Sequence, residues 1–153
     1  MKRSYWLGLI AAVLLAAIAT GITTYAQMKR PYRDGSVWSM QFIHMKPGME
    51  SAYLTYIGTE WKKEMEALKK EGLILGYKVI TSEPHNAADW NIVLMTEYKN
   101  LATMEANAEK EEGVAMKLAG DEQKMRQGYK DRLEIRDILG SRVAREVVLE
   151  PRP

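Results

Sequence analysis

Two histidines, His44 and His85, are the first residues to consider for chemistry, because histidine titrates near neutral pH and ligates metals. Glu83, Asp89 and Glu97 could add acid–base groups, but no spacing in the sequence pairs any of them with a partner. His44 falls near the end of a predicted strand and His85 in a predicted turn, where solvated histidines are ordinary. His44 is therefore a weaker candidate, and we assign no catalytic residue.

Four residues that suit a soft metal, Met40, His44, Met45 and Met49, would fit a copper(I) site. On one strand, however, Met40 and His44 stand ~13 Å apart at ~3.3 Å per residue, so methionine as core filler is the better interpretation. The chain has no cysteine, which excludes disulfides, cysteine nucleophiles and thiolate metal sites. Phosphate-loop, zinc and Ser/His/Asp signatures do not occur. We expect neither a metal nor a cofactor.

The composition indicates one globular domain. A length of 153 residues suits a single core, and apolar and charged shares of 46% and 27% are ordinary for globular proteins. Without Lys2 and Arg3 the chain carries 20 basic and 20 acidic residues. This balance lacks the basic footprint of a nucleic-acid binder, so we expect no nucleic-acid partner.

Residues 1–26 have the pattern of a secretory signal peptide, with a basic start, an apolar run and Thr24-Tyr25-Ala26 before a cleavage point. We expect a periplasmic or secreted protein. The alternative is an uncleaved anchor in the inner membrane through residues 5–26, which are uncharged and long enough to span a bilayer. Only in that case would the membrane be a partner. Residues 27–35 are polar and aperiodic, which predicts a flexible leader.

Residues 36–151 are expected to form the folded domain. Alternation predicts strands and a repeat of about four predicts helices. The first helix shows its apolar stripe in Tyr53, Ile57, Trp61 and Met65. The predicted elements, in order, are a strand over Val37–Met45 ended by Pro47-Gly48, a helix over Met49–Glu71 ended by Gly72, strands over Leu73–Ser82 and Trp90–Tyr98, a helix capped by Asn100 and weakened or divided by Gly113 and Gly120, a further helix from Asp121-Glu122 to Gly140, and a strand over Arg145–Glu150.

This order predicts an α+β fold of the ferredoxin-like type, a split β-α-β unit with an extra helix and a four-stranded antiparallel sheet. The expected inner positions are Leu101, Met104 and Ala108 on the helix after Asn100, and Met125, Tyr129 and Leu133 on the extra helix.

The strand Trp90–Tyr98 is apolar at consecutive positions over Ile92–Met95, so both of its faces require cover. Helices can cover only one face of such a sheet, and monomers avoid large exposed apolar patches. We therefore expect a homodimer joined through sheet faces. The alternative is that the leader and the extra helix fold over the second face.

Two stretches, VWSMQFIHMKPG followed by an amphipathic helix and ADWNIVLMTEYKNLATMEA, resemble the dimeric α+β barrel superfamily, which includes antibiotic-biosynthesis-type monooxygenases, haem-degrading enzymes and stress-responsive barrel proteins. The resemblance covers roughly residues 36–150. It implies a barrel formed by two subunits around a cavity lined by the sheet face away from the helices, and no single activity. Haem-degrading members use an Asn, a Trp and a His, but Asn91 and Trp90 are adjacent on a strand and point to opposite sides, so that triad is not carried over.

A small-molecule pocket is mostly apolar with a few polar groups. The less apolar sheet face fits this description and is assigned to the cavity, with Trp38, Met40 and Phe42 as the alternative lining. The candidate residues are Gln41, Ile43, Lys78, Ile80, Asn91, Val93, Met95 and Glu97, with Trp38 and His44 as weaker candidates.

Two classes of function follow. The first is an exported binding protein that holds a small apolar molecule in its barrel without catalysis. The second is a cofactor-independent monooxygenase or isomerase acting on an aromatic or quinone-like substrate. The absence of a titrating group with a defined partner favours the first.

Overall fold

The computed structural model describes residues 31–149 except residue 87. The chain divides into two units, and the larger one, Asp34–Val148, contains the sheet and all of the helices below. The predicted signal peptide, residues 1–26, lies outside the described residues, as do residues 27–30 of the predicted leader. In the described part of the chain, no helix is both long and apolar enough to cross a membrane.

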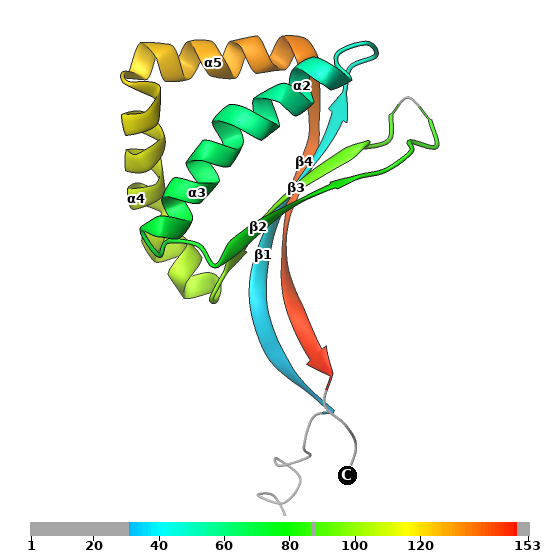
Figure 1. Cartoon of the computed structure of the whole chain (residues 1–153). Helices are drawn as coiled ribbons and strands as arrows, with labels where there is room; N and C mark the ends of the chain where they lie inside the picture. The colour runs from blue at the N-terminus through cyan, green and yellow to red at the C-terminus, as the bar shows by residue number, and fades with distance from the viewer. Residues whose placement is uncertain (1–30, 87, 150–153) are drawn as a thin grey trace, which may run out of the picture. The chain divides into compact units, whose positions relative to one another are not determined.

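Four strands and a series of helical segments make up the fold (Figure 1). Strand β1 begins at Tyr32, within the segment expected to be leader. The elements are β1 (Tyr32–Met45), α2 (Glu50–Tyr56), η1 (Ile57–Trp61), α3 (Lys62–Lys70), β2 (Gly76–Thr81), β3 (Ile92–Tyr98), α4 (Leu101–Ala119), α5 (Glu122–Ile135) and β4 (Arg136–Leu149).

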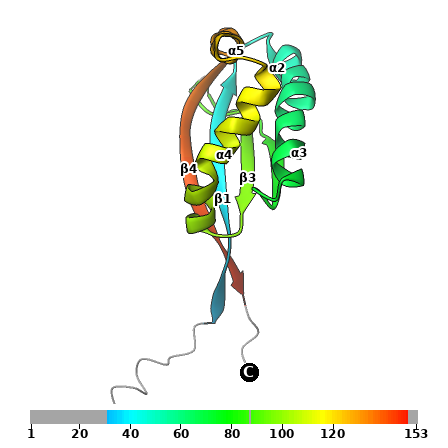
Figure 2. The same cartoon turned by 90° about the vertical axis from the view of Figure 1, so that its left-hand side faces the viewer.

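The strand order in the sheet is β2-β3-β1-β4, and β3 pairs antiparallel with both β1 and β2. All helices lie on the same side of this sheet, with α4 in front of it in Figure 2 and β4 at its edge. This arrangement confirms the predicted α+β fold with a four-stranded antiparallel sheet in a ferredoxin-like order.

The first helix contains a π-turn, η1, between α2 and α3. Its buried side chains Tyr53, Ile57, Trp61 and Met65 recur at every fourth residue, as expected. In an α-helix each such step turns about 40° past a full turn, so the stripe would drift around the helix. The wider i→i+5 turn of η1 offsets part of this drift and keeps all four side chains in the core against β1 and β3.

The boundaries of several elements follow from caps that the sequence contains. Asn100 accepts a hydrogen bond from the Thr103 amide at 2.8 Å and begins α4. Asp121 does the same for α5. Gly72 and Gly120 have φ values of 70° and 92°, in the left-handed region that favours glycine, and they follow the ends of α3 and α4.

The predicted end of the extra helix at Gly140 is wrong. Helix α5 ends at Ile135, and β4 begins directly at Arg136. Arg136 is 5% exposed and its guanidinium donates hydrogen bonds to Tyr53 Oη (2.9 Å) and Gln41 Oε1 (3.1 Å). These partners come from the first helix and from β1, so the local pattern could not indicate them.

Some predicted inner positions are also wrong. On α5, Tyr129 and Leu133 are exposed, and on α4, Leu101 is exposed while Met104 packs against the core. Ala108 is exposed as well. The reason is that α5 lies across the ends of α2 and α4 (Figure 1), so only a short part of its surface meets other helices.

Candidate functional site

The register of the sheet decides which side chains share a face. Phe42 pairs with Val93 and Met40 with Met95, while β2 places Ile80 beside Val93. Residues directly opposite each other in a sheet point to the same side. These side chains, joined on the same side by Trp38, His44, Lys78 and Glu97, form the face that no helix covers, which we call the open face.

Gln41 and Ile43 do not belong to this face. Gln41 pairs with Leu94 and Ile43 with Ile92, and these partners lie in the core beneath the helices. The expectation that they share a face with Val93 is wrong, because residues 41 and 43 alternate with residues 40 and 42 and so point the other way. Gln41 instead accepts the hydrogen bond from Arg136.

Asn91 has a structural role. Its side chain accepts a hydrogen bond from the Met45 amide at 2.7 Å and donates one to the Met45 carbonyl at 3.2 Å. It is 9% exposed. The amide therefore satisfies the backbone where β1 ends, and both of its functional atoms are occupied within the chain.

The histidines are both engaged near one loop. His44 Nδ1 lies 2.8 Å from the Asp89 carbonyl oxygen, and His85 Nδ1 lies 3.3 Å from the Asp89 carboxylate. Trp90, from the same loop, packs edge-to-face on Phe42 with centroids 5.7 Å apart. This loop thus borders one end of the open face with an aromatic pair and a half-buried histidine.

The open face is apolar at its centre and charged toward one end. Lys78 lies 4.7 Å from the ring centroid of Trp38 in a cation–π contact. Counting alternate residues from Arg136, whose side chain points to the helices, places Leu139 and Val143 of β4 on this face, and they are 45% and 54% exposed. An apolar surface that continues across four strands without cover is typical of an interaction site.

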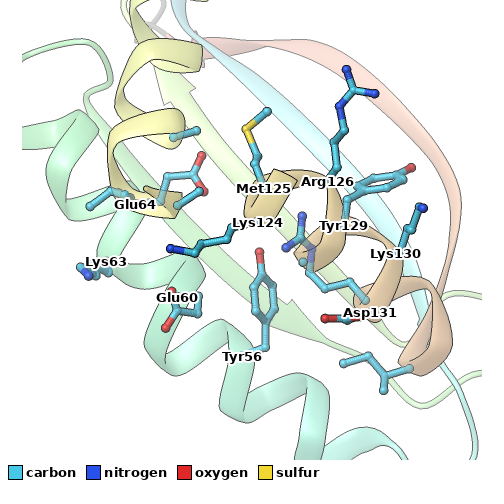
Figure 3. A pocket seen from close by; sticks show the side chains of 16 residues that line it. Tyr56, Glu60, Lys63, Glu64, Lys124, Met125, Arg126, Tyr129, Lys130 and Asp131 are labelled. Atoms are coloured by element: carbon cyan, nitrogen blue, oxygen red, sulfur yellow. The ribbon is translucent and has the colours of Figure 1, made fainter. Parts of the chain in front are cut away.

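A second site lies between the helices, where no candidate was predicted. A cavity of about 1100 Å³ opens between the first helix, the end of α4 and the inner side of α5; we call it the three-helix pocket (Figure 3). Figure 3 shows Tyr56 projecting from the end of α2 toward α5, while Arg126 points away from it. Its lining residues include Tyr56, Glu60, Lys63, Glu64, Leu118, Lys124, Met125, Tyr129, Lys130 and Arg132.

Arg132 is the central cation of this pocket. Its guanidinium carbon lies 5.0 Å from the Tyr56 ring centroid and 5.8 Å from that of Tyr129. Its Nε is buried and has no hydrogen-bond partner among the described residues. The sequence signal that could have revealed this site is the set Tyr129, Arg132 and Arg136, spaced by three and four. That spacing indicates a pocket only together with the orientation of α5, which the sequence does not give.

The carboxyl groups behind the pocket are partly withdrawn from solvent. Burial raises the pKa of Glu64, which Arg132 opposes and Glu111 reinforces. Burial also raises the pKa of Glu111, which accepts a hydrogen bond from Tyr98 Oη at 2.9 Å. Deeper in the core, burial raises the pKa of Tyr53 to about 12 despite the nearby Arg136. In all three groups the main cause is burial, which disfavours the charged form.

The described residues include no group of three or more His, Cys, Asp or Glu side chains arranged to hold a metal ion. The strand order and the helices on one side of the sheet define an α+β protein with a ferredoxin-like sheet.

The sequence matches no protein-family model and no curated protein. Among solved structures, the chain is similar to the crystal structure of HapK from Hahella chejuensis. The sequence identity is 8% and the TM-score is 0.49, over 72% of this chain and 91% of the HapK chain. A sequence identity and a TM-score this low give no information about function.

Proposed function

We propose that this protein is an exported homodimer of the dimeric α+β barrel type, which holds a small apolar molecule between the open faces of two subunits and performs no catalysis. The observation that carries the proposal is the continuous apolar patch that Met40, Phe42, Ile80 and Met95 form around the buried Val93 on the sheet face without helices. Burying such a surface stabilises an assembly by roughly 25 cal/mol per Å².

A second copy of the chain is the occupant best suited to this face. Where β1, β2 and β3 pair with one another, the charged groups described on this face are the cation Lys78 and the carboxylate Glu97, near the same end. A two-fold interface uses the same patch twice, so Lys78 of one copy can lie opposite Glu97 of the other, and the reverse. The charges then favour pairing in one register.

The long strands support the same arrangement. β1 pairs with β3 only from Val37 onward, so Asp34–Ser36 pair with β4 alone, held by Arg145 to Asp34 (2.9 Å) and Ser36 to Glu146 (3.1 Å). A two-stranded ribbon is marginally stable by itself, and exposed apolar residues of β4 continue from Val143 in the four-stranded sheet to Val147 in the ribbon. Contact with a second copy would bury these residues.

The hydrogen bonds already made by Asn91 and His44 favour a binding role over oxygenase or isomerase chemistry. Both functional atoms of Asn91 are bonded to Met45, and Nδ1 of His44 contacts the Asp89 backbone. A general base needs a free atom within hydrogen-bond reach of the substrate. Asn91 offers none, and His44, whose Nε2 remains for such a role, lies at the end of the open face and not at its apolar centre.

The test is a titration of the purified protein with uncharged aromatic compounds, including quinones, while oxygen uptake is recorded. The proposal expects saturable binding, quenching of Trp38 fluorescence and no oxygen consumption. Replacing Phe42 with Ala should weaken binding about tenfold, since a buried aromatic contact contributes roughly 1.5–3 kcal/mol. Oxygen uptake that saturates with the compound would contradict the binding role and support the oxygenase.

A further inference from the structure

The three-helix pocket contains a cation that the fold leaves without an anion. Among the described residues Arg132 makes no hydrogen bond or ion pair; its guanidinium lies against the rings of Tyr56 and Tyr129, and the Glu64 carboxylate acts on it only at longer range. A half-buried guanidinium that lacks an acceptor retains its full capacity for a bidentate bond to a carboxylate, sulfonate or phosphate.

The basic residues of the lining differ in their availability to an anion. Five basic residues line the pocket against three acidic ones: Lys63, Lys124, Arg126, Lys130 and Arg132 against Glu60, Glu64 and Asp131. Lys124 and Arg126 already pair with Asp121 and Glu122, outside the lining. Arg132 is the basic residue that lies between two rings, so an incoming anion would meet it without displacing a protein carboxylate.

The rest of the lining suits an apolar body. The apolar residues of the lining come from two helices, Ala115, Leu118 and Ala119 from α4 and Met125 and Ile135 from α5. A volume of about 1100 Å³ slightly exceeds the range for small-molecule sites, roughly 300–1,000 Å³, so the pocket can hold a ligand of that class. The pocket therefore combines a hydrophobic wall with a single well-placed charge.

We propose that the three-helix pocket is a second binding site, for an organic anion whose acidic group bonds to the guanidinium of Arg132 and whose apolar or aromatic body lies against Tyr56, Leu118 and Met125. The site is formed within one subunit by residues remote from the open face. It does not depend on the dimer or on a ligand between the sheets.

The π-turn supplies one element of this site. Tyr56 precedes η1 and Glu60 lies within it, so the extra residue in the turn sets the angle between Tyr56 and the α3 residues of the lining. Such turns occur frequently at functional sites, because they present side chains that a regular helix would direct elsewhere.

The test compares two fluorescent probes with one scaffold, 8-anilinonaphthalene-1-sulfonate and uncharged N-phenyl-1-naphthylamine. Replacing Arg132 with Gln should weaken sulfonate binding about tenfold or more, because hydrogen bonds to charged groups are worth roughly 1.5–3 kcal/mol, and should change binding of the uncharged probe little. Arg142→Gln, an exposed arginine of β4 outside the lining, is the matched control and should leave both affinities unchanged.

Glu64→Gln should change the affinity for the sulfonate in the opposite direction. Removing this carboxylate from the pocket should tighten sulfonate binding, and it carries the test if Arg132→Gln fails to fold, as judged by circular dichroism. Met40→Glu, on the open face, should leave the Arg132-dependent binding intact. The proposal is overturned if sulfonate affinity is the same in wild type and Arg132→Gln, if Glu64→Gln gives no tightening, or if binding is lost in Met40→Glu alone.

Discussion

The side-chain amide of Asn91 exchanges two hydrogen bonds with the backbone of Met45, 2.7 Å from the Met45 amide and 3.2 Å to its carbonyl. This pair closes β1 where the Lys46-Pro47 segment leaves the sheet. A conspicuous polar residue beside the open face is thereby part of the framework, and the polar groups open to a ligand lie elsewhere.

Asn91→Ala should lower the free energy of unfolding by about 1–3 kcal/mol, because it leaves the buried amide and carbonyl of Met45 unsatisfied. Urea unfolding followed by circular dichroism measures this loss. Gln123→Ala, which removes an exposed side-chain amide on α5, is the control and should change stability by less than ~0.5 kcal/mol. Equal stability of the two variants would show that the Asn91–Met45 pair is not formed in solution.

Met40 and Gln41 are neighbours in sequence that point to opposite faces, so they should respond differently to substitution. Met40→Glu places a charge at the centre of the open face and should convert dimers to monomers or aggregate, as measured by light scattering. If Met40→Glu keeps the oligomeric state of the wild type, the open face is not the interface.

Gln41→Leu should leave the oligomeric state unchanged and destabilise the fold. It removes the acceptor for Arg136, a buried guanidinium whose Nε already lacks a partner among the described residues. We expect a loss of about 1–3 kcal/mol in chemical unfolding. A Gln41→Leu protein as stable as wild type but monomeric would reverse the assignment of the two faces.

Glu64 should make stability depend on pH. Its pKa is raised in the folded protein by burial, so the folded state binds a proton more readily than the unfolded state does. The stability that Glu64 contributes is therefore complete below pH 4.5, its ordinary pKa, and declines as pH rises through the folded value.

Substituting Gln removes this dependence. Glu64→Gln should gain stability relative to wild type between pH 4 and pH 7, measured by urea unfolding at both values. Glu71→Gln, an exposed position directly after the same helix, should show no such gain. A wild-type protein that becomes more stable than Glu64→Gln as pH rises would contradict the burial of this carboxyl.

Local signals predicted the elements well where a residue acts on its own segment. Pro47 follows the end of β1, Gly72 takes the left-handed conformation after α3, and Asn100 caps α4. The alternation that marks a strand also predicted that the sheet has two distinct faces. It could not establish which residues of β1 and β3 share a face, because that depends on a register set by pairing between distant strands.

The three-helix pocket was missed for a related reason. Met125, Tyr129 and Leu133 have the spacing of an inner stripe, yet Arg132 lines the pocket between Tyr56 and Tyr129 while Leu133 is exposed. The orientation of α5 follows from Arg136, which bonds to Tyr53 and Gln41 and so fixes where the helix must stop. No periodic pattern within α5 contains that information.

The central claim is that two copies of this chain join through their open faces, and the most direct measurement is the mass of the purified wild-type protein by static light scattering at micromolar concentration. The account predicts the mass of two chains, and a decrease to one chain in Met40→Glu. A wild-type mass of one chain would contradict both the dimer and the cavity between the sheets.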